Sequence, residues 1–567
     1  MKIFLALILF VSINYDMYHS RELTIDDLVF PTPLHLQKGD EKIILDRNTK
    51  FIFLYDEKLK SPIFLEILEF YGNLLHKNKI KNEKVEVKNE VVLINLKVKN
   101  LIMKKFSNKY STNFEEYDLS IRPSNKKENM INVEIEAFYL NGLLRSLETL
   151  SQIIFFNDDY DNYSNSQRYE IYNLPIKIND RPRFGYRGLM IDTSRHFISL
   201  KKIMRIIDGL MYNKMNVLHW HITDDEYFGF GSKMMKNQKY TFSKTELKYL
   251  INYAEIRGVT IIFEIDNPSH TRSWKDLSYN NKKLSDLAIV RTKPEYGVLD
   301  PSKNTTYKIV KKLVKEVVSL YTKDPDMPDD KDNSILIHLG GDEVLSDMWD
   351  SLEIKDFMKN NNLNDTSQLE NFYFNKISEI IPSENIYLYW VNDKSKQIYD
   401  IYHKDNSVLM YWGIHSNLKT FLDDVMKNKI DYQKESKIIL ASGDFLYLDC
   451  GSGNKYGDGT WCGDYKTWKK IYNFPIFENY GSFSIIGSEA VLFGELADEN
   501  SIMGKIFPRI NSLSEILWRD EQKDRNIKNF FYKLLIHNKR LINRGIEVIS
   551  ITSQLCEENP DECIDRL

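Results

Sequence analysis

The chain has 567 residues, of which 42% are hydrophobic, so it is long enough to bury a large core. Its net charge of -4 gives no electrostatic basis for binding nucleic acid and excludes that class of partner. Aromatic residues make up 13% of the chain, which fits either stacking against sugars or a tyrosine-rich core.

The chain begins with Met1-Lys2 and a short apolar run from Ile3 to Val11, the pattern of a signal peptide. This run is too short to cross a bilayer, which needs about 20 residues. The alternative is a buried N-terminal strand. We interpret residues 1–20 as a signal peptide that directs the chain into the secretory pathway, for secretion or for the lysosome. No later run predicts a stable membrane span.

Residues 21–180 are predicted to form a small α+β support domain. The spacing of apolar residues predicts helices over 63–75 and 141–155. Short apolar runs predict strands at 43–45, 51–53, 91–94 and 133–138. The polar stretch 157–167 reads as a linker, and no catalytic cluster is found in this unit.

The remainder, residues 181–567, is predicted to be a catalytic barrel with a C-terminal extension. From Arg187 onward, strand-like runs alternate with helical segments, which indicates a parallel sheet. Eight strand ends predict a (β/α)8 barrel, whose active site lies at the C-terminal ends of the strands. These ends lie at 189–192, 217–222, 260–264, 335–338, 386–390, 408–412, 438–441 and 490–493.

The fourth strand end carries two adjacent carboxylates, Asp342 and Glu343. Neighbouring side chains of a regular strand point to opposite faces, so both can serve one site only where the pleat breaks. Gly340 and Gly341 precede the pair and permit such a break. We expect the strand to deliver an acid pair into a cleft. The alternative is a solvated strand end in which Asp342 caps the next helix.

Other strand ends carry further polar side chains. Arg195 offers a rigid fork of hydrogen-bond donors that suits sugar hydroxyls. The alternative interpretation is that Arg195 forms a structural ion pair with Asp192. His219 and His221 are typical of satisfied core histidines, whereas His270 could orient a carboxylate through its ring N–H. The spacing contains no HExxH or similar local pattern, so we predict neither a metal site nor a cofactor.

Several strings resemble, in the same order, the motifs of the family 20 glycoside hydrolases, the β-N-acetylhexosaminidases. The resemblance runs from about Gly185 to Trp518, and the motifs together are far more specific than any one alone. The strings are Asp192-Thr-Ser-Arg-His196, His219-Trp-His-Ile-Thr-Asp-Asp225, Asp266-Asn-Pro-Ser-His270, His338-Leu-Gly-Gly-Asp-Glu343, the strand-end tryptophans Trp390 and Trp412, Tyr447-Leu-Asp449, and Phe493-Gly-Glu495.

The resemblance implies a role for each matching residue. Glu343 and Asp342 become the catalytic pair, supported by a relay through His270 and Asp224. Sugar or acetamido contacts are then expected from Arg195, Trp390, Trp412, Tyr447, Asp449, Phe493 and Glu495. A neighbouring anion at Asp342 is also expected to raise the pKa of Glu343, as a general acid requires.

The implied activity is exo-hydrolysis of terminal, non-reducing β-linked GlcNAc or GalNAc by a retaining, substrate-assisted mechanism. The substrate would be an oligosaccharide, glycoprotein, glycolipid or chitin fragment, and the resemblance leaves a homodimer open. Two alternatives are a sugar-binding protein that has lost catalysis and a different retaining glycosidase on the same fold. Retention of Asp342, Glu343, Tyr447 and Arg195 argues against the first.

The sequence departs from the family pattern at three places that border the site. Phe493 stands where tryptophan is usual, Ser269 stands where glycine is usual, and Glu226 to Gly229 replaces Gln-Ser-Phe-Pro. A phenyl ring covers less sugar than an indole, unless Trp461 or Phe228 fills the gap. These departures bear on affinity and substrate preference.

Four cysteines and three sequons support export. The local pairing, Cys450–Cys462 and Cys556–Cys563, is one of three possible, and neither pair has the spacing of a metal ligand. The candidate glycosylation sites are Asn162, Asn304 and Asn364.

Overall fold

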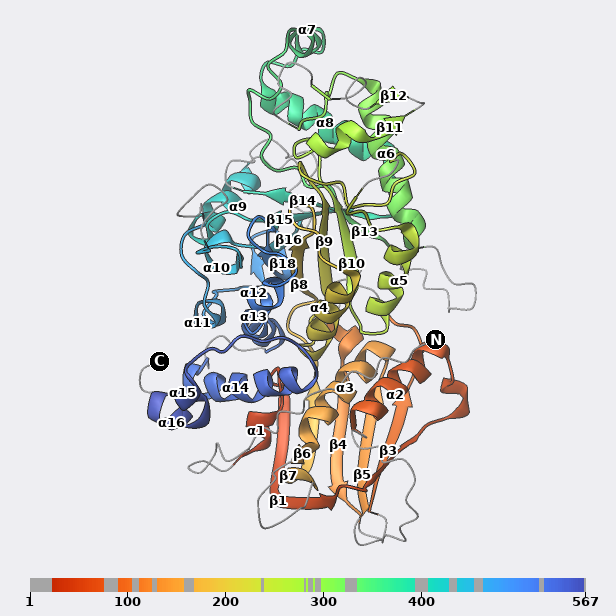
Figure 1. Ribbon diagram of the computed structural model, residues 1–567, viewed down its shortest axis with the longest axis vertical. Coiled ribbons are helices and arrows are strands. Elements are labelled where there is room, and N and C mark those ends of the chain that lie inside the picture. Colours follow the sequence, from red (N-terminus) through yellow and green to blue (C-terminus); the bar gives the residue numbers. More distant parts are fainter. Residues whose placement is uncertain are drawn as a thin grey trace.

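The computed structural model describes most of the chain in fourteen ranges. These are 23–75, 90–104, 112–124, 130–157, 168–235, 239–279, 282–283, 289–290, 297–321, 334–392, 406–427, 436–452, 462–519 and 525–564. The predicted signal peptide, Asn162, Trp461 and most of the predicted linker lie outside them. Figure 1 shows a sheet covered by helices at the foot of the molecule and a barrel above it.

The N-terminal sheet has the strand order β1-β7-β4-β5-β3-β2, with β6 paired to β7. The two predicted helices are confirmed as α2 (Pro62–Leu75) and α3 (Leu140–Ile153), preceded by the short α1 (Ile25–Leu28). All four predicted strands form, while β4, β6 and β7 were missed. The strands are β1 (His35–Asp46), β2 (Lys50–Leu54), β3 (Val91–Val98), β4 (Tyr117–Pro123), β5 (Met130–Ala137), β6 (Phe155–Asn157) and β7 (Arg168–Asp180).

Eight parallel strands form a closed barrel, which confirms the predicted fold class. The ring closes because β18 pairs with both β16 and β8. Most of these strands are buried on both faces, as expected for a sheet enclosed by helices. The strands are β8 (Tyr186–Asp192), β9 (Val217–Thr223), β10 (Thr260–Ile265), β13 (Leu336–His338), β14 (Ile386–Val391), β15 (Ser407–Tyr411), β16 (Ser436–Leu440) and β18 (Phe483–Leu492).

Helices from α4 to α13 lie around and above the barrel, α14 to α16 lie beside the N-terminal sheet, and short hairpins extend the barrel loops (Figure 1). The helices are α4 (Leu200–Tyr212), α5 (Lys244–Glu255), α6 (Asn304–Val318), α7 (Leu352–Asn360), α8 (Thr366–Ile380), α9 (Leu418–Lys427), α10 (Gly443–Leu446), α11 (Trp468–Tyr472), α12 (Ile502–Ile506), α13 (Arg509–Trp518), α14 (Ile527–Asn543), α15 (Gln554–Glu558) and α16 (Pro560–Cys563). The two-residue strands are β11 (Ser278–Tyr279), β12 (Lys282–Lys283) and β17 (Asn479–Tyr480). None of the helices in the described ranges has the length and apolar content that a bilayer crossing needs.

A buried ion cluster joins the sheet unit to the base of the barrel. Glu115 accepts from Arg145 Nε at 2.7 Å and from Arg187 Nη2 at 2.7 and 2.6 Å, and all three side chains are nearly inaccessible. Arg145 Nη2 also donates to the carbonyls of Met215 and Gly258. Helix α3 is therefore held against the barrel by charge-assisted bonds as well as by apolar packing.

Candidate active site

The backbone leaves the strand geometry directly after β13, as the two glycines predicted. Gly340, Gly341 and Glu343 have φ angles of 68°, 97° and 54°. A Cβ on Gly340 would lie 1.6 Å from Asp266 Oδ1, so glycine is required by space as well as by conformation. Glu343 holds a left-handed angle without being glycine, a costly geometry that marks functional positions.

The two adjacent carboxylates occupy different environments. Glu343 has a side chain that is 55% exposed, whereas Asp342 Oδ1 is buried and has no hydrogen-bond partner among the described residues. Burial, opposed by His270 and reinforced by Glu343, raises the pKa of Asp342 to about 6. A buried acceptor without a partner is costly, and such an atom is commonly reserved for a ligand.

The expected rise in the pKa of Glu343 is not found in the structure. A hydrogen bond from His270, outweighing burial, lowers the pKa of Glu343 below its ordinary value. The sequence argument counted the anion at Asp342 but not the imidazole of His270, which lies beside Glu343. Because Glu343 is largely exposed, burial under a substrate can reverse the direction of its shift.

His270 connects Glu343 to a buried carboxylate, as the predicted relay requires. His270 Nε2 lies 3.4 Å from Glu343 Oε2, and His270 Nδ1 lies 3.5 Å from Asp224 Oδ2. Burial opposes the charge of His270, but Asp224 raises its pKa well above the usual value. Asp224 therefore favours a positively charged His270 beside the exposed carboxyl of Glu343.

Arg195 gathers carboxylates from three strand ends. Its guanidinium lies 3.0 Å from Asp192 Oδ2, 2.6 Å from Asp224 Oδ2, 3.4 Å from Glu226 Oε2 and 3.9 Å from Glu495 Oε1. The ion pair with Asp192 therefore exists, and the same arginine also reaches the site. Glu226, one of the residues that departs from the family pattern, adds an anion to this cluster.

Four aromatic residues of the expected sugar site belong to one apolar cluster in the barrel. Trp390 is buried, and Trp412 is partly buried against the barrel interior. Burial and then the Asp342 charge raise the pKa of Tyr447 well above its usual value, so the phenol keeps its proton. The Phe493 ring lies 5.8 Å from Tyr447 and 5.3 Å from the Arg195 guanidinium.

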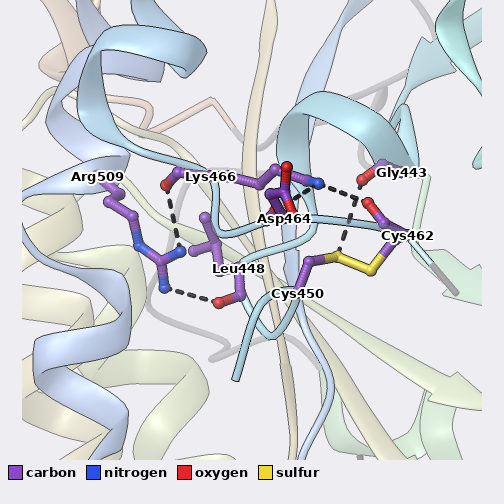
Figure 2. The surroundings of a disulfide bond; sticks show 7 residues. All are labelled: Gly443, Leu448, Cys450, Cys462, Asp464, Lys466 and Arg509. Atoms are coloured by element: carbon purple, nitrogen blue, oxygen red, sulfur yellow. Dashed lines mark hydrogen bonds between the residues drawn. A yellow bond between two sulfur atoms is a disulfide. The ribbon is translucent and has the colours of Figure 1, made fainter. Parts of the chain in front are cut away.

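The loop that carries Tyr447 and Asp449 is held by a disulfide and two buried cations (Figure 2). The predicted bond between Cys450 and Cys462 is formed. Lys466 Nζ donates to the carbonyls of Cys462 and Asp464 at 2.5 and 2.7 Å, and Arg509 Nη2 donates to the carbonyl of Leu448 at 2.7 Å. Asp449 Oδ1 is buried without a partner among the described residues, and burial raises the pKa of Asp449 to about 6.

A group of buried acids and bases lies inside the barrel below the site. The histidines His219 and His221 were expected to be core residues, whereas no role was predicted for Glu264 or Asp266. Glu264 lies near the end of β10 and Asp266 follows directly after that strand, while His219 and His221 alternate along β9 and share one face of it. Charged side chains at alternate positions of a doubly buried strand were the available signal. Burial and then Asp342 raise the pKa of Asp266 well above the usual value.

One triad in this group has the composition of a metal site. Potential ligand atoms of His219, Glu264 and His338 lie within 4.8 Å of one another. Glu264 already has close partners at both oxygens, and His219 Nδ1 already bonds to Glu489. The group therefore fits a network of internal hydrogen bonds and ion pairs better than a metal site.

The remaining predicted positions lie outside the group of residues described above. The second disulfide, Cys556–Cys563, is formed near the C-terminus. Asn304 and Asn364 are both exposed, a condition that glycosylation requires. Phe228 is fully buried against Trp274 and does not fill the space beside Phe493.

Comparisons with known proteins agree with this geometry. The β-hexosaminidase subunit beta of Rattus norvegicus is 32% identical over 432 residues, covering 73% of this chain and 72% of that protein. The β-hexosaminidase subunit B1 of Dictyostelium discoideum is 29% identical over 563 residues, covering 94% and 91%. The solved exo β-N-acetylglucosaminidase of Vibrio harveyi shares the fold, with a TM-score of 0.68, 21% identity and coverage of 94% and 80%.

Residues 184–521, more than half of the chain, match the sequence profile described as glycosyl hydrolase family 20, catalytic domain. This span contains the barrel and all of the catalytic and sugar-binding residues expected from the sequence. The chain therefore belongs to glycosyl hydrolase family 20 and is a glycoside hydrolase.

Proposed function

We propose that this protein is an exo-acting β-N-acetylhexosaminidase that removes terminal β-linked GlcNAc or GalNAc from the non-reducing end of a glycan. One observation carries the proposal: Asp342 Oδ1 is a buried acceptor without a partner among the described residues, directly beside the exposed acid Glu343. The N–H of a 2-acetamido group supplies the donor that this oxygen lacks. The names of the curated relatives support the same activity.

Glu343 is the proposed general acid. Cleavage of a glycoside needs a proton on the leaving oxygen and stabilisation of a cationic sugar. A bound substrate removes water from Glu343, and desolvation raises the pKa of a carboxyl. His270 and Asp224 hold the Glu343 side chain in place while this shift occurs.

The substrate supplies the nucleophile. The acetamido oxygen attacks the anomeric carbon, the bond to the leaving oxygen breaks, and Glu343 gives that oxygen its proton. The ionised Asp342 accepts the acetamido N–H and balances the oxazolinium charge, while the Tyr447 phenol donates to the amide oxygen. Glu343 then takes a proton from the water that opens the ring, so the product keeps its configuration.

The remaining contacts set specificity. Arg195, Asp449 and Glu495 bind the sugar hydroxyls, because guanidinium and carboxylate groups together offer both donors and acceptors. Trp390 and Trp412 enclose the acetamido methyl group and exclude water.

Release of nitrophenol from the β-glycosides of GlcNAc, GalNAc and glucose tests the activity. We expect hydrolysis of the two acetamido glycosides and none of the glucoside, with the β-anomer as the first product seen by NMR. Binding of GlcNAc without hydrolysis would instead indicate a sugar-binding protein. Cleavage of the glucoside at a similar rate would indicate a different retaining glycosidase.

The two disulfides fit an oxidising compartment, so we propose that the protein passes through the secretory pathway to the lysosome or the cell exterior. Mass spectrometry of non-reduced peptides from exported protein checks both bonds and the glycans at the three sequons. A homodimer stays a prediction, which light scattering of the purified protein tests. The natural substrate among oligosaccharides, glycoproteins, glycolipids and chitin fragments is resolved by comparing kcat/KM across these classes.

A further inference from the structure

One buried carboxylate touches both halves of the proposed site. Glu264 is inaccessible to solvent and lies on β10 inside the barrel. Its Oε1 accepts the indole N–H of Trp390 at 2.7 Å. Its Oε2 lies 2.6 Å from His221 Nδ1 and 3.1 Å from His219 Nε2, although the His219 ring is not aligned for a hydrogen bond.

The two carboxylate oxygens of Glu264 contact different parts of the site. Through His221, whose Nε2 lies 3.0 Å from Asp224 Oδ2, Glu264 reaches the residue that holds His270 and Arg195. Through Trp390, the same carboxylate fixes a wall of the expected acetamido pocket. We propose that Glu264 is a positioning residue. It fixes the acid relay and the wall of the acetamido pocket relative to each other.

The chemistry of the group supports this role. Both oxygens of a carboxylate accept hydrogen bonds, whereas an amide has one acceptor and one donor end. The indole of Trp390 can only donate. In Glu264→Gln, an amide oxygen turned toward Trp390 forces its NH2 against His221, which must then give up its Nδ1 proton. The opposite orientation sets two donors against each other at Trp390. The variant therefore loses either the cationic state of His221 or the hydrogen bond to Trp390.

The charge of Glu264 also acts on its neighbours. Burial disfavours the charged form of His221, but Glu264 and Asp224 raise the pKa of His221 well above its usual value. His338 behaves differently, because burial lowers its pKa to about 4, and it accepts the Gly340 N–H at 3.0 Å. A cationic His221 can donate to Glu264 and Asp224 at once, which a neutral ring cannot do.

The test compares Glu264→Gln with Glu489→Gln as a matched control. Glu489 is equally buried and bonds to His219 Nδ1 at 2.8 Å and to the Tyr186 hydroxyl, but to no residue of the relay or the pocket wall. Both variants remove one buried carboxylate charge from the barrel interior. A purely structural role therefore predicts similar effects from both.

The kinetic readouts rest on the proposed function, so a binding readout accompanies them. We expect Glu264→Gln to change one of two ratios by about tenfold, the cost of one unmade buried hydrogen bond. The first is the preference for an N-acetyl over an N-propionyl glucosaminide, which reports the pocket wall. The second is the kcat ratio between good and poor leaving groups, which reports the acid. Glu489→Gln should leave both ratios within about threefold of the wild type.

Calorimetric binding of free GlcNAc and its N-propionyl analogue measures the first ratio without catalysis. If the wild type binds GlcNAc but does not hydrolyse its glycosides, the proposed function is wrong. The ratio of the two affinities then still tests the role of Glu264. Equal ratios in Glu264→Gln and the wild type, or the same change in both variants, would overturn the inference. Should Glu264→Gln fail to fold, Glu264→Asp keeps the charge but is one methylene shorter, and unchanged ratios in that variant would overturn it equally.

Discussion

The molecule contains two buried groups of carboxylates and cations, one at the base of the barrel and one at its catalytic end. At the base, Glu115 is bonded to both Arg145 and Arg187 and is nearly inaccessible to solvent. At the catalytic end, Glu343 is exposed and Asp342 Oδ1 is unpaired among the described residues. At the base, the carboxylate pairs with both cations, and the cluster joins the N-terminal sheet unit to the barrel. At the catalytic end, a carboxylate oxygen of Asp342 can still accept a hydrogen bond from a ligand.

The pKa shifts of the two buried carboxyls express this difference. Burial alone would raise the pKa of Glu115, but Arg187 and Arg145 outweigh it and lower the pKa below its ordinary value. At Asp342, burial wins and raises the pKa to about 6. Ionisation of Glu115 therefore favours the folded state, whereas ionisation of Asp342 opposes it. Amide substitutions at the two sites should have opposite effects on stability.

The largest expected effect is on catalysis. Glu343→Gln removes proton transfer to the leaving group, which contributes about 10²- to 10⁴-fold to the rate. We expect this loss on poor leaving groups and a smaller loss on activated aryl glycosides, measured as kcat across a series of leaving groups. Equal losses along the series would contradict the general-acid role.

Glu115→Gln should lower the free energy of unfolding and leave the catalytic activity of the folded protein unchanged. Removing one partner of a buried ion cluster leaves uncompensated cations and costs about 3–5 kcal/mol. Urea unfolding measures this loss, while kcat/KM per folded molecule should equal that of the wild type. A drop in kcat/KM would show that the base and the catalytic end are coupled, which would break the comparison.

Asp342→Asn should abolish most activity and stabilise the protein by about 1–2 kcal/mol at pH 7. Because the folded-state pKa of Asp342 lies above the usual unfolded value near 3.9, the native state binds the proton more tightly. Wild-type stability therefore falls as the pH rises from about 4 to about 6, and the variant lacks this fall.

Thermal unfolding of the Asp342→Asn variant and the wild type at several pH values checks the sign. The advantage of the variant should be full above about pH 6 and absent below about pH 4. A destabilised variant at pH 7 would mean that Asp342 holds the fold as Glu115 does.

The smallest effect is expected at Phe493, which is half-buried between Arg195, His221 and Tyr447. An indole covers a few tens of Å² more sugar, worth on the order of 1 kcal/mol. Phe493→Trp should raise kcat/KM on a GlcNAc glycoside severalfold and leave the pH optimum unchanged. Lower activity would show that the pocket is shaped around phenylalanine and that the preferred substrate differs from the family's usual one.

Much of the architecture could be predicted from the chain. The alternation of apolar runs and helical segments predicted the barrel, and all eight strand ends fall at or beside observed strands. These predictions succeeded because the periodicity of apolar residues that marks a strand or a helix is a property of a short stretch of sequence. The two cysteine pairings were also local and are confirmed. Strands β4 and β7 were missed although their apolar and polar residues partly alternate.

The sequence by itself determined the acid pair and its glycine-dependent turn, because Gly340, Gly341, Asp342 and Glu343 are consecutive. Only the tertiary structure decided the ionisation of these acids. His270, which lowers the pKa of Glu343, comes from another strand end, and the burial that raises the pKa of Asp342 comes from the closed barrel. The contacts of Glu264 likewise join β9, β10, β13 and β14. Charge and burial act through space, so their outcome is fixed only when the strands meet.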